Sequence, residues 1–178
     1  MKNKNIKKIL VLGLDNSGKT SIVKSLKGIK NIHSFCSINP TIGVNLENFE
    51  LLESSFNIWD FGGQFLYRAE FLKEFEKYIK EVEKIIYVID IQDTQKYDLS
   101  LKYLKEIIKK VINLKMKIDF SIFLHKNDLD IEFINPNFDK SNIDVLITKI
   151  RDLIPDDFNY SLFKTAISTI FEKENIII

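Results

Sequence analysis

The stretch GLDNSGKT, residues 13–20, follows the apolar run Ile9 to Leu12 and precedes residues suited to a helix. It matches the pattern G-x-x-x-x-G-K-[ST] in the strand-to-helix context that this pattern requires. Glycines let the backbone wrap closely, so that successive N–H groups point at a phosphate where a helix N-terminus also favours negative charge. The sequence therefore predicts a phosphate-binding loop, in which Lys19 supplies a cation and Thr20 a hydroxyl for Mg²⁺.

The rest of the chain alternates short runs rich in Ile and Val with longer amphipathic stretches. KIIYVID (84–90), for example, is followed by LSLKYLKEIIKKVINL (99–114), whose apolar residues have helical spacing. This alternation is typical of an α/β fold in which helices cover both faces of a mostly parallel sheet. Because the link between VNLENFELL (44–52) and SSFNIWDF (54–61) is too short for a crossover helix, these two strands should be antiparallel neighbours. We expect a six-stranded sheet with one antiparallel edge strand.

Composition narrows the possible partners and compartment. At 178 residues and 45% hydrophobic content, the chain is expected to form a single domain over residues 1–178. The 26 basic and 25 acidic residues nearly cancel, and without a basic tract nucleic acid is not an expected partner. The single cysteine, Cys36, suits a reducing cytoplasm. Lys2 at the myristoylation position and the terminal Ile178 predict no encoded lipid anchor, leaving at most peripheral membrane association.

Three further segments indicate the chemistry of the site. In NPTIG (39–43), Thr41 can reach a metal and a γ-phosphate if the loop closes over them. In WDFGGQ (59–64), Asp60 can hold Mg²⁺, Gly63 can offer its N–H to the γ-phosphate, and Gln64 can orient an attacking water. HKND (125–128) follows a predicted strand and therefore lies at the sheet edge where ligands bind in open α/β folds.

Taken together, these motifs resemble those of the small GTPases of the Ras superfamily, and within them the Arf and Rag/Gtr branches. GLDNSGKT, NPTIGVN and WDFGGQ look like the Arf pattern, whereas HKND and FKTAI (163–167) look more like Rag/Gtr. The resemblance implies a P-loop G domain that binds GTP and GDP with Mg²⁺. Thirteen residues follow Thr165, fewer than a typical member needs, so the last helix is expected to be short or truncated.

The resemblance also assigns roles to individual residues. Asp128 would accept hydrogen bonds from guanine N1–H and its 2-amino group, Lys126 would lie along the ring, and the N–H groups of residues 165–167 would face the guanine carbonyl. His125 stands where most of the superfamily has Asn. The implied nucleotide-binding residues are Asp15, Asn16, Ser17, Gly18, Lys19, Thr20, Ser21, His125, Lys126, Asp128, Thr165, Ala166 and Ile167; the Mg²⁺ ligands are Thr20, Thr41 and Asp60; and the catalytic residues are Gln64, Gly63 and Lys19.

A molecular switch is the function that these motifs favour. Its segments from the 30s to residue 43 and from 61 to 75 would order around the γ-phosphate, under the control of an exchange factor and a GTPase-activating protein, and would be read by effector proteins. The alternatives are a GTP-binding assembly subunit with little hydrolysis and a P-loop kinase or ATPase. Arg68 and Arg151 are the chain's two arginines, and the loop around Thr41 has none. Only Arg68 lies near Gln64 in sequence, and no arginine lies near Thr41 to stabilise the charge of the transition state. We therefore expect slow intrinsic hydrolysis, on the order of 10⁻⁴ to 10⁻² per second.

Overall fold

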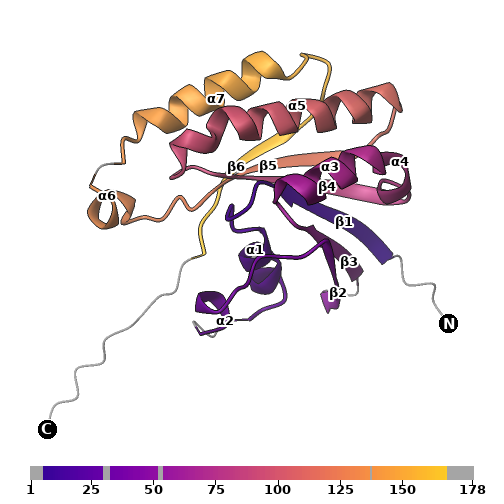
Figure 1. Cartoon of the computed structure of the whole chain (residues 1–178), viewed down its shortest axis with the longest axis horizontal. Helices are drawn as coiled ribbons and strands as arrows, with labels where there is room; N and C mark the ends of the chain where they lie inside the picture. Colours follow the sequence, from indigo (N-terminus) through magenta and orange to yellow (C-terminus); the bar gives the residue numbers. More distant parts are fainter. Residues whose placement is uncertain (1–5, 30–32, 52–53, 137, 168–178) are drawn as a thin grey trace, which may run out of the picture.

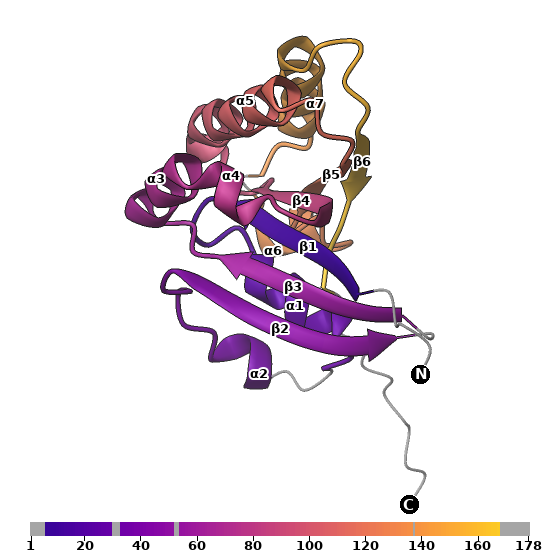
Figure 2. The ribbon, with the colours of Figure 1, turned by 90° about the vertical axis from the view of Figure 1, so that its right-hand side faces the viewer.

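The computed structural model describes residues 6–29, 33–51, 54–136 and 138–167, and within these ranges a six-stranded sheet forms the centre of the molecule. The strand order is β2-β3-β1-β4-β5-β6. Only the β2–β3 pair is antiparallel among the neighbouring pairs of this sheet, which confirms the predicted edge strand (Figure 2). The strands are β1 (Ile6–Gly13), β2 (Val44–Leu51), β3 (Ser54–Phe61), β4 (Val82–Asp90), β5 (Asp119–His125) and β6 (Ser161–Lys164).

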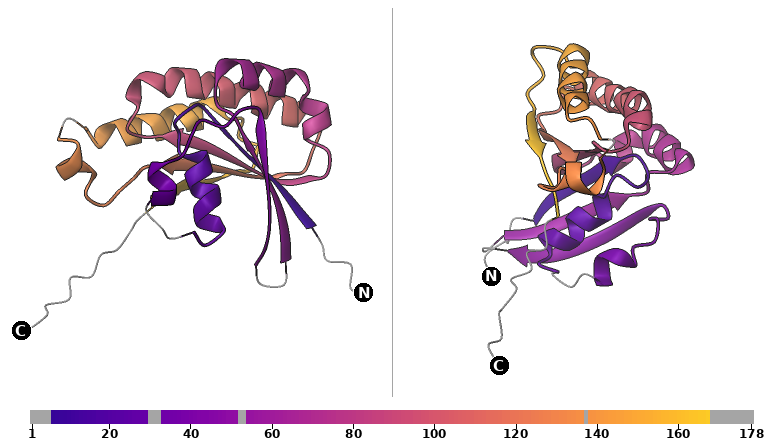
Figure 3. Two further views of the ribbon diagram at one scale, coloured as in Figure 1. Left: turned by 60° about the horizontal axis from the view of Figure 1, so that its bottom comes forward. Right: turned by 90° about the vertical axis from the view of Figure 1, so that its left-hand side faces the viewer.

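Helices lie on both faces of the sheet. In Figure 1 the helices α3, α4, α5 and α7 lie above it and α1 lies below, an arrangement that the two views of Figure 3 also show. The helices are α1 (Lys19–Leu26), α2 (His33–Cys36), α3 (Phe65–Lys73), α4 (Phe75–Tyr78), α5 (Tyr97–Asn113), α6 (Ile131–Ile134) and α7 (Ser141–Leu153), with a 3₁₀ turn η1 at Thr94–Lys96. No helix in the described ranges has the length and apolar character needed to cross a membrane.

Strand β1 is buried on both sides, and its side chains alternate between two hydrophobic clusters. Leu10 and Leu12 belong to the larger cluster, which also contains the buried faces of α5 and α7. Val11 belongs to the smaller cluster, together with Ile22 and Val23 of α1. This double burial holds the carboxyl end of β1 between the layers, and the phosphate-loop sequence begins there.

The amphipathic stretch AEFLKEFEKYIKEV (69–82) does not form one helix. Helix α3 ends at Lys73, and Glu74 leaves helical geometry with φ −97° and ψ 23° before α4 begins. The break allows the rings of Phe71 and Phe75, both buried, to meet at 78°, while Phe71 stacks on Tyr78. Aromatic packing therefore overrides the helical periodicity at this point. The last helix expected from the sequence falls on residues 168–178, outside the described residues.

Candidate functional site

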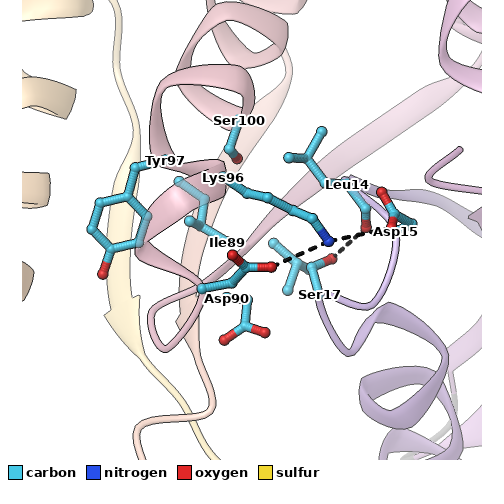
Figure 4. Close-up of a pocket in the computed structure, with 10 residues that line it drawn as sticks. Leu14, Asp15, Ser17, Ile89, Asp90, Lys96, Tyr97 and Ser100 are labelled. Carbon is cyan, nitrogen blue, oxygen red and sulfur yellow. Dashed lines mark hydrogen bonds and ion pairs between the residues drawn. The ribbon is translucent and has the colours of Figure 1, made fainter. Parts of the chain in front are cut away.

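The segment between β1 and α1 forms a tight loop that ends in a helix N-terminus. Asn16 and Gly18 adopt left-handed backbone conformations, with φ values of 60° and 90°. Gly18 also packs directly on the imidazole of His125, where a Cβ would overlap the ring, so both its φ and its surroundings require glycine. Ser17 Oγ donates to the Leu14 carbonyl at 2.9 Å and closes the loop on itself (Figure 4).

Lys19 begins α1 and points back into this loop. Its side chain is buried, with 6% of the residue exposed, and Nζ donates to the Leu14 carbonyl at 2.6 Å. Burial lowers the Lys19 pKa to about 8, against the opposing influence of the carboxylates of Asp60 and Asp15. Because burial disfavours the charged form of Lys19, the side chain is suited to a ligand that brings negative charge.

Asp60, at the end of β3, lies between two threonine hydroxyls. Its Oδ2 accepts from Thr20 Oγ1 at 2.6 Å and from Thr41 Oγ1 at 3.3 Å, and the two hydroxyls are 3.1 Å apart. The carboxylate is fully buried, burial raises its pKa, and Oδ1 has no hydrogen-bond partner among the described residues. An orphaned carboxylate oxygen beside two hydroxyls fits a hard cation such as Mg²⁺.

The coordination shell of such a cation would need further ligands. Among the described residues, no group of three or more His, Cys, Asp or Glu side chains could hold a metal. Mg²⁺ needs no such cage, because it takes one or two protein ligands and completes its shell with waters and substrate phosphates. The expected set of Thr20, Thr41 and Asp60 is therefore brought together by the fold and fits the ion.

Gly62, Gly63 and Gln64 follow β3 and touch both neighbouring loops. Gly62 N–H donates to the Gly43 carbonyl at 2.8 Å. Gly63 packs on the peptide that joins Leu14 to Asp15, and a Cβ there would overlap that peptide. Gln64 Oε1 is buried without a hydrogen-bond partner in the described part of the chain. This segment therefore lies directly against the phosphate loop and carries an acceptor that a water can satisfy.

His125 connects the phosphate loop to the end of the sheet. Its residue is 3% exposed, and Nδ1 lies 3.0 Å from Thr165 Oγ1. Burial lowers the His125 pKa to about 4, so the ring is neutral at physiological pH. The N–H of Thr165 donates to the Leu124 carbonyl at 2.9 Å, so this N–H, which the sequence predicted to face the guanine carbonyl, is engaged within the protein.

Two residues that the motifs did not indicate hold HKND in place. Asp90, at the end of β4, forms a 2.6 Å ion pair with Lys126. Gln92 donates through Nε2 to the Lys126 carbonyl at 2.9 Å and makes a longer contact of 3.5 Å with Asp128 Oδ2. The sequence did contain a signal, since Asp90 ends the run KIIYVID and β4 pairs with β5.

A third residue that the motifs missed contacts the phosphate loop itself. Lys96 of η1 bridges Asp15, at 3.3 Å, and Asp93, at 3.1 Å. Figure 4 shows the Lys96 side chain reaching across to Asp15. The pair tethers the loop to the segment after β4. All three side chains are partly exposed, so this bridge contributes little to stability.

These side chains surround two adjoining cavities. One of about 350 Å³ is lined by residues 15–21, 38–41, 63 and 64. The other, about 240 Å³, is lined by His125, Asp128 and Ile167. The two cavities share Gly18, Ser21, Phe35 and Lys126. Of the predicted site residues, Asp60, Thr165 and Ala166 line neither cavity; Asp60 is bonded to Thr20 and Thr41, and Thr165 to His125.

Comparison with known proteins gives the family. The sequence model of the ADP-ribosylation factor (Arf) family matches residues 1–151. The chain belongs to the Arf family. It is 35% identical over 123 residues to ADP-ribosylation factor-like protein 2 of Dictyostelium discoideum, covering 69% of this chain and 61% of that protein. It is 36% identical over 121 residues to ADP-ribosylation factor-like protein 6 of Danio rerio, covering 68% and 62%. The chain thus spans less than two thirds of these relatives' length.

A solved structure supports the fold. The small GTPase Arl6 of Trypanosoma brucei, determined with the nucleotide analogue GppNp bound, superposes with a TM-score of 0.66 at 22% identity, covering 91% of this chain and 87% of that one. The likeness confirms a small GTPase fold. The comparisons support the Arf branch, while the similarity of HKND and FKTAI to Rag/Gtr proteins remains an observation on those two motifs.

Proposed function

We propose that this Arf-family chain is a GTP-binding switch that hydrolyses GTP slowly. The observation that carries the proposal is the convergence of Lys19, Thr20, Thr41, Gly63, Gln64 and Asp128 around two adjoining cavities, with Asp60 hydrogen-bonded to Thr20 and Thr41. These groups come from four separate segments of the sequence. Each has the chemistry needed by a different part of a guanine nucleotide with its Mg²⁺.

The larger cavity suits the phosphates and the smaller one the base. Lys19 and the N–H groups at the start of α1 would hold the β- and γ-phosphates. Thr20, Thr41 and Asp60 would hold Mg²⁺, which neutralises charge on the phosphates when it is bound. Gly63 would contact the γ-phosphate and Gln64 would orient the attacking water, whereas Asp128 would read the guanine edge.

The proposal also includes regulation by other proteins and a cellular location. Residues 38–41 line the phosphate cavity, as do Gly63 and Gln64 after β3, so both segments can respond to a γ-phosphate. Proteins that exchange nucleotide, accelerate hydrolysis or read the closed form would act there. The balanced charge and single cysteine favour a cytoplasmic location.

Hydrolysis is the first property to measure. Under single-turnover conditions, the wild type is expected to hydrolyse GTP on the order of 10⁻⁴ to 10⁻² per second without an activating protein. Gln64→Leu should be at least about tenfold slower with nearly unchanged GTP affinity, because the amide orients water and contributes little to the ground state. Hydrolysis near one per second by the isolated protein would contradict the proposal. Equal rates in both proteins would favour the assembly subunit.

Trp59 provides a readout of switching. The half-buried indole lies beside Asp60, its Nε1 donates to Asn57 Oδ1, and Lys8 Nζ is 4.1 Å from the ring centre. We expect its fluorescence to change when GDP is exchanged for a non-hydrolysable GTP analogue in the presence of Mg²⁺. Thr20→Asn, which selectively impairs the GTP state, should abolish the change. Identical wild-type spectra in the two states would indicate a static binding module.

A further inference from the structure

Arg68 is a buried cation whose role the site described above leaves open. It lies near the start of α3, only 9% of the residue is exposed, and its Nε donates to the Gly63 carbonyl at 2.9 Å. This bond spans five residues within the segment that follows β3. The chain's arginine nearest to Gln64 is therefore directed toward its own backbone.

Two aromatic rings surround the guanidinium. Its Cζ lies 5.4 Å from the ring centre of Tyr103 on α5 and 6.0 Å from that of Phe65. Within the described ranges, no carboxylate forms an ion pair with Arg68. A buried charge without a counter-ion is expensive unless the cation is well held, and stacking on rings together with a directed hydrogen bond provides that hold. The arrangement fixes the guanidinium against α5.

Gly63 is consequently held from two sides. Its Cα packs on the Leu14–Asp15 peptide of the phosphate loop, while its carbonyl accepts the Arg68 hydrogen bond. The peptide that carries this carbonyl also carries the N–H of Gln64, so fixing one orients the other. Gln64 in turn supplies the carbonyl to which the Arg68 N–H donates at 3.1 Å.

We propose that Arg68 is a positioning residue for GTP hydrolysis, acting through the Gly63–Gln64 peptide and touching neither nucleotide nor water. The inference rests on the proposed function. This role differs from that of an arginine that neutralises transition-state charge. Arg68 would act through the hydrogen bond from its Nε to the Gly63 carbonyl, and not through its charge. Loss of this hydrogen bond should lower the rate of hydrolysis and leave nucleotide affinity nearly unchanged.

Three substitutions distinguish the hydrogen bond from the charge. In Arg68→Gln, the amide nitrogen is as many bonds from Cα as Nε, so this variant keeps the donor and removes the charge. Arg68→Lys keeps a charge and moves the donor outward, and Arg68→Met removes both. We expect Arg68→Met to slow single-turnover hydrolysis about tenfold to hundredfold, Arg68→Lys to be similarly slow, and Arg68→Gln to stay within about threefold of the wild type. GTP affinity should change less than about threefold in each.

Two controls test whether the effect passes through Gln64. In the Gln64→Leu background, Arg68→Met should cause no further slowing, because residues that act as one unit are not additive. Arg151→Met removes the chain's other arginine, which is exposed on α7, and should leave the rate unchanged. Full additivity of the two substitutions at 64 and 68 would overturn the inference.

Hydrogen–deuterium exchange provides a readout independent of catalysis. Peptides covering residues 62–66 should exchange faster in Arg68→Met than in the wild type, and at the wild-type rate in Arg68→Gln. Unchanged exchange in Arg68→Met, or a rate rescued by lysine and not by glutamine, would overturn the inference. If the wild type shows no hydrolysis, the proposed function fails, while the exchange measurement still decides the role of Arg68.

Discussion

Replacing Asp128 by asparagine is expected to change the preferred nucleotide from GTP to xanthosine triphosphate. In the proposed function the carboxylate would accept from both donors on the guanine edge, N1–H and the 2-amino group, whereas an amide presents one donor and one acceptor. Mismatched buried hydrogen-bonding groups are strongly rejected, so the relative affinity for the two nucleotides should change by about 10⁴-fold. Competition titration of a fluorescent nucleotide with GTP, xanthosine triphosphate and ATP measures the change.

The control for Asp128 lies two residues further on. Asp130 is exposed and contributes to raising the Asp128 pKa, after the larger effect of burial. Asp130→Asn therefore removes a nearby negative charge without altering the Asp128 carboxylate, and the protein should still prefer guanine nucleotides. Equal affinity of the wild type for ATP and GTP would remove guanine selectivity from the proposal and favour the kinase or ATPase alternative.

Lys19→Ala should weaken the binding of both GDP and GTP by about 10²- to 10³-fold. The substitution removes a buried cation whose partners would be the phosphates common to both nucleotides, and truncating one member of a buried charge pair is costly. Isothermal titration with each nucleotide measures the loss. The matched control is Lys27→Ala, at the end of α1, which removes a surface ion pair with Glu47. This variant should bind both nucleotides as the wild type does.

The same lysine predicts a pH dependence. Burial lowers the Lys19 pKa to about 8 in the free protein, and nucleotide phosphates favour the protonated form. As the pH rises above about 8, binding must first protonate the amine, so GDP affinity should fall with a slope approaching tenfold per pH unit. A flat affinity between about pH 7 and pH 9 would show that Lys19 does not hold the phosphates in its charged form.

The phosphate loop and the sheet topology follow from local sequence features. Gly18 needs a left-handed backbone, and the loop falls between an apolar run and a helix, so its place could be read before any packing was known. The short link between residues 52 and 54 likewise left β2 and β3 no geometry except an antiparallel pair. In both cases a short-range constraint is sufficient.

Other features depend on short elements or on contacts between distant segments, which the sequence motifs do not specify. Helices α2 and α6 contain four residues each, too few for periodicity to be recognised. The direction of Arg68 depends on Tyr103 and on the turn at Gly63, and the pairing of Asp90 with Lys126 depends on the register of β4 and β5. Such side-chain directions are set by tertiary packing, which depends on the whole sequence and cannot be predicted from one motif.

The central position of β1 has a consequence for how the chain acquires its structure during synthesis. Although β1 comes first, its two neighbours are β3, which begins at Ser54, and β4, which begins at Val82. A chain made from its N-terminus at roughly 5–20 residues per second therefore extends for several seconds before β1 can pair on both sides. Until β4 has left the ribosome, Gly13 lacks the Val88 backbone against which it packs. We therefore expect nucleotide to be captured only late in translation, and chains interrupted before residue 90 to expose one unpaired edge of β1 to chaperones.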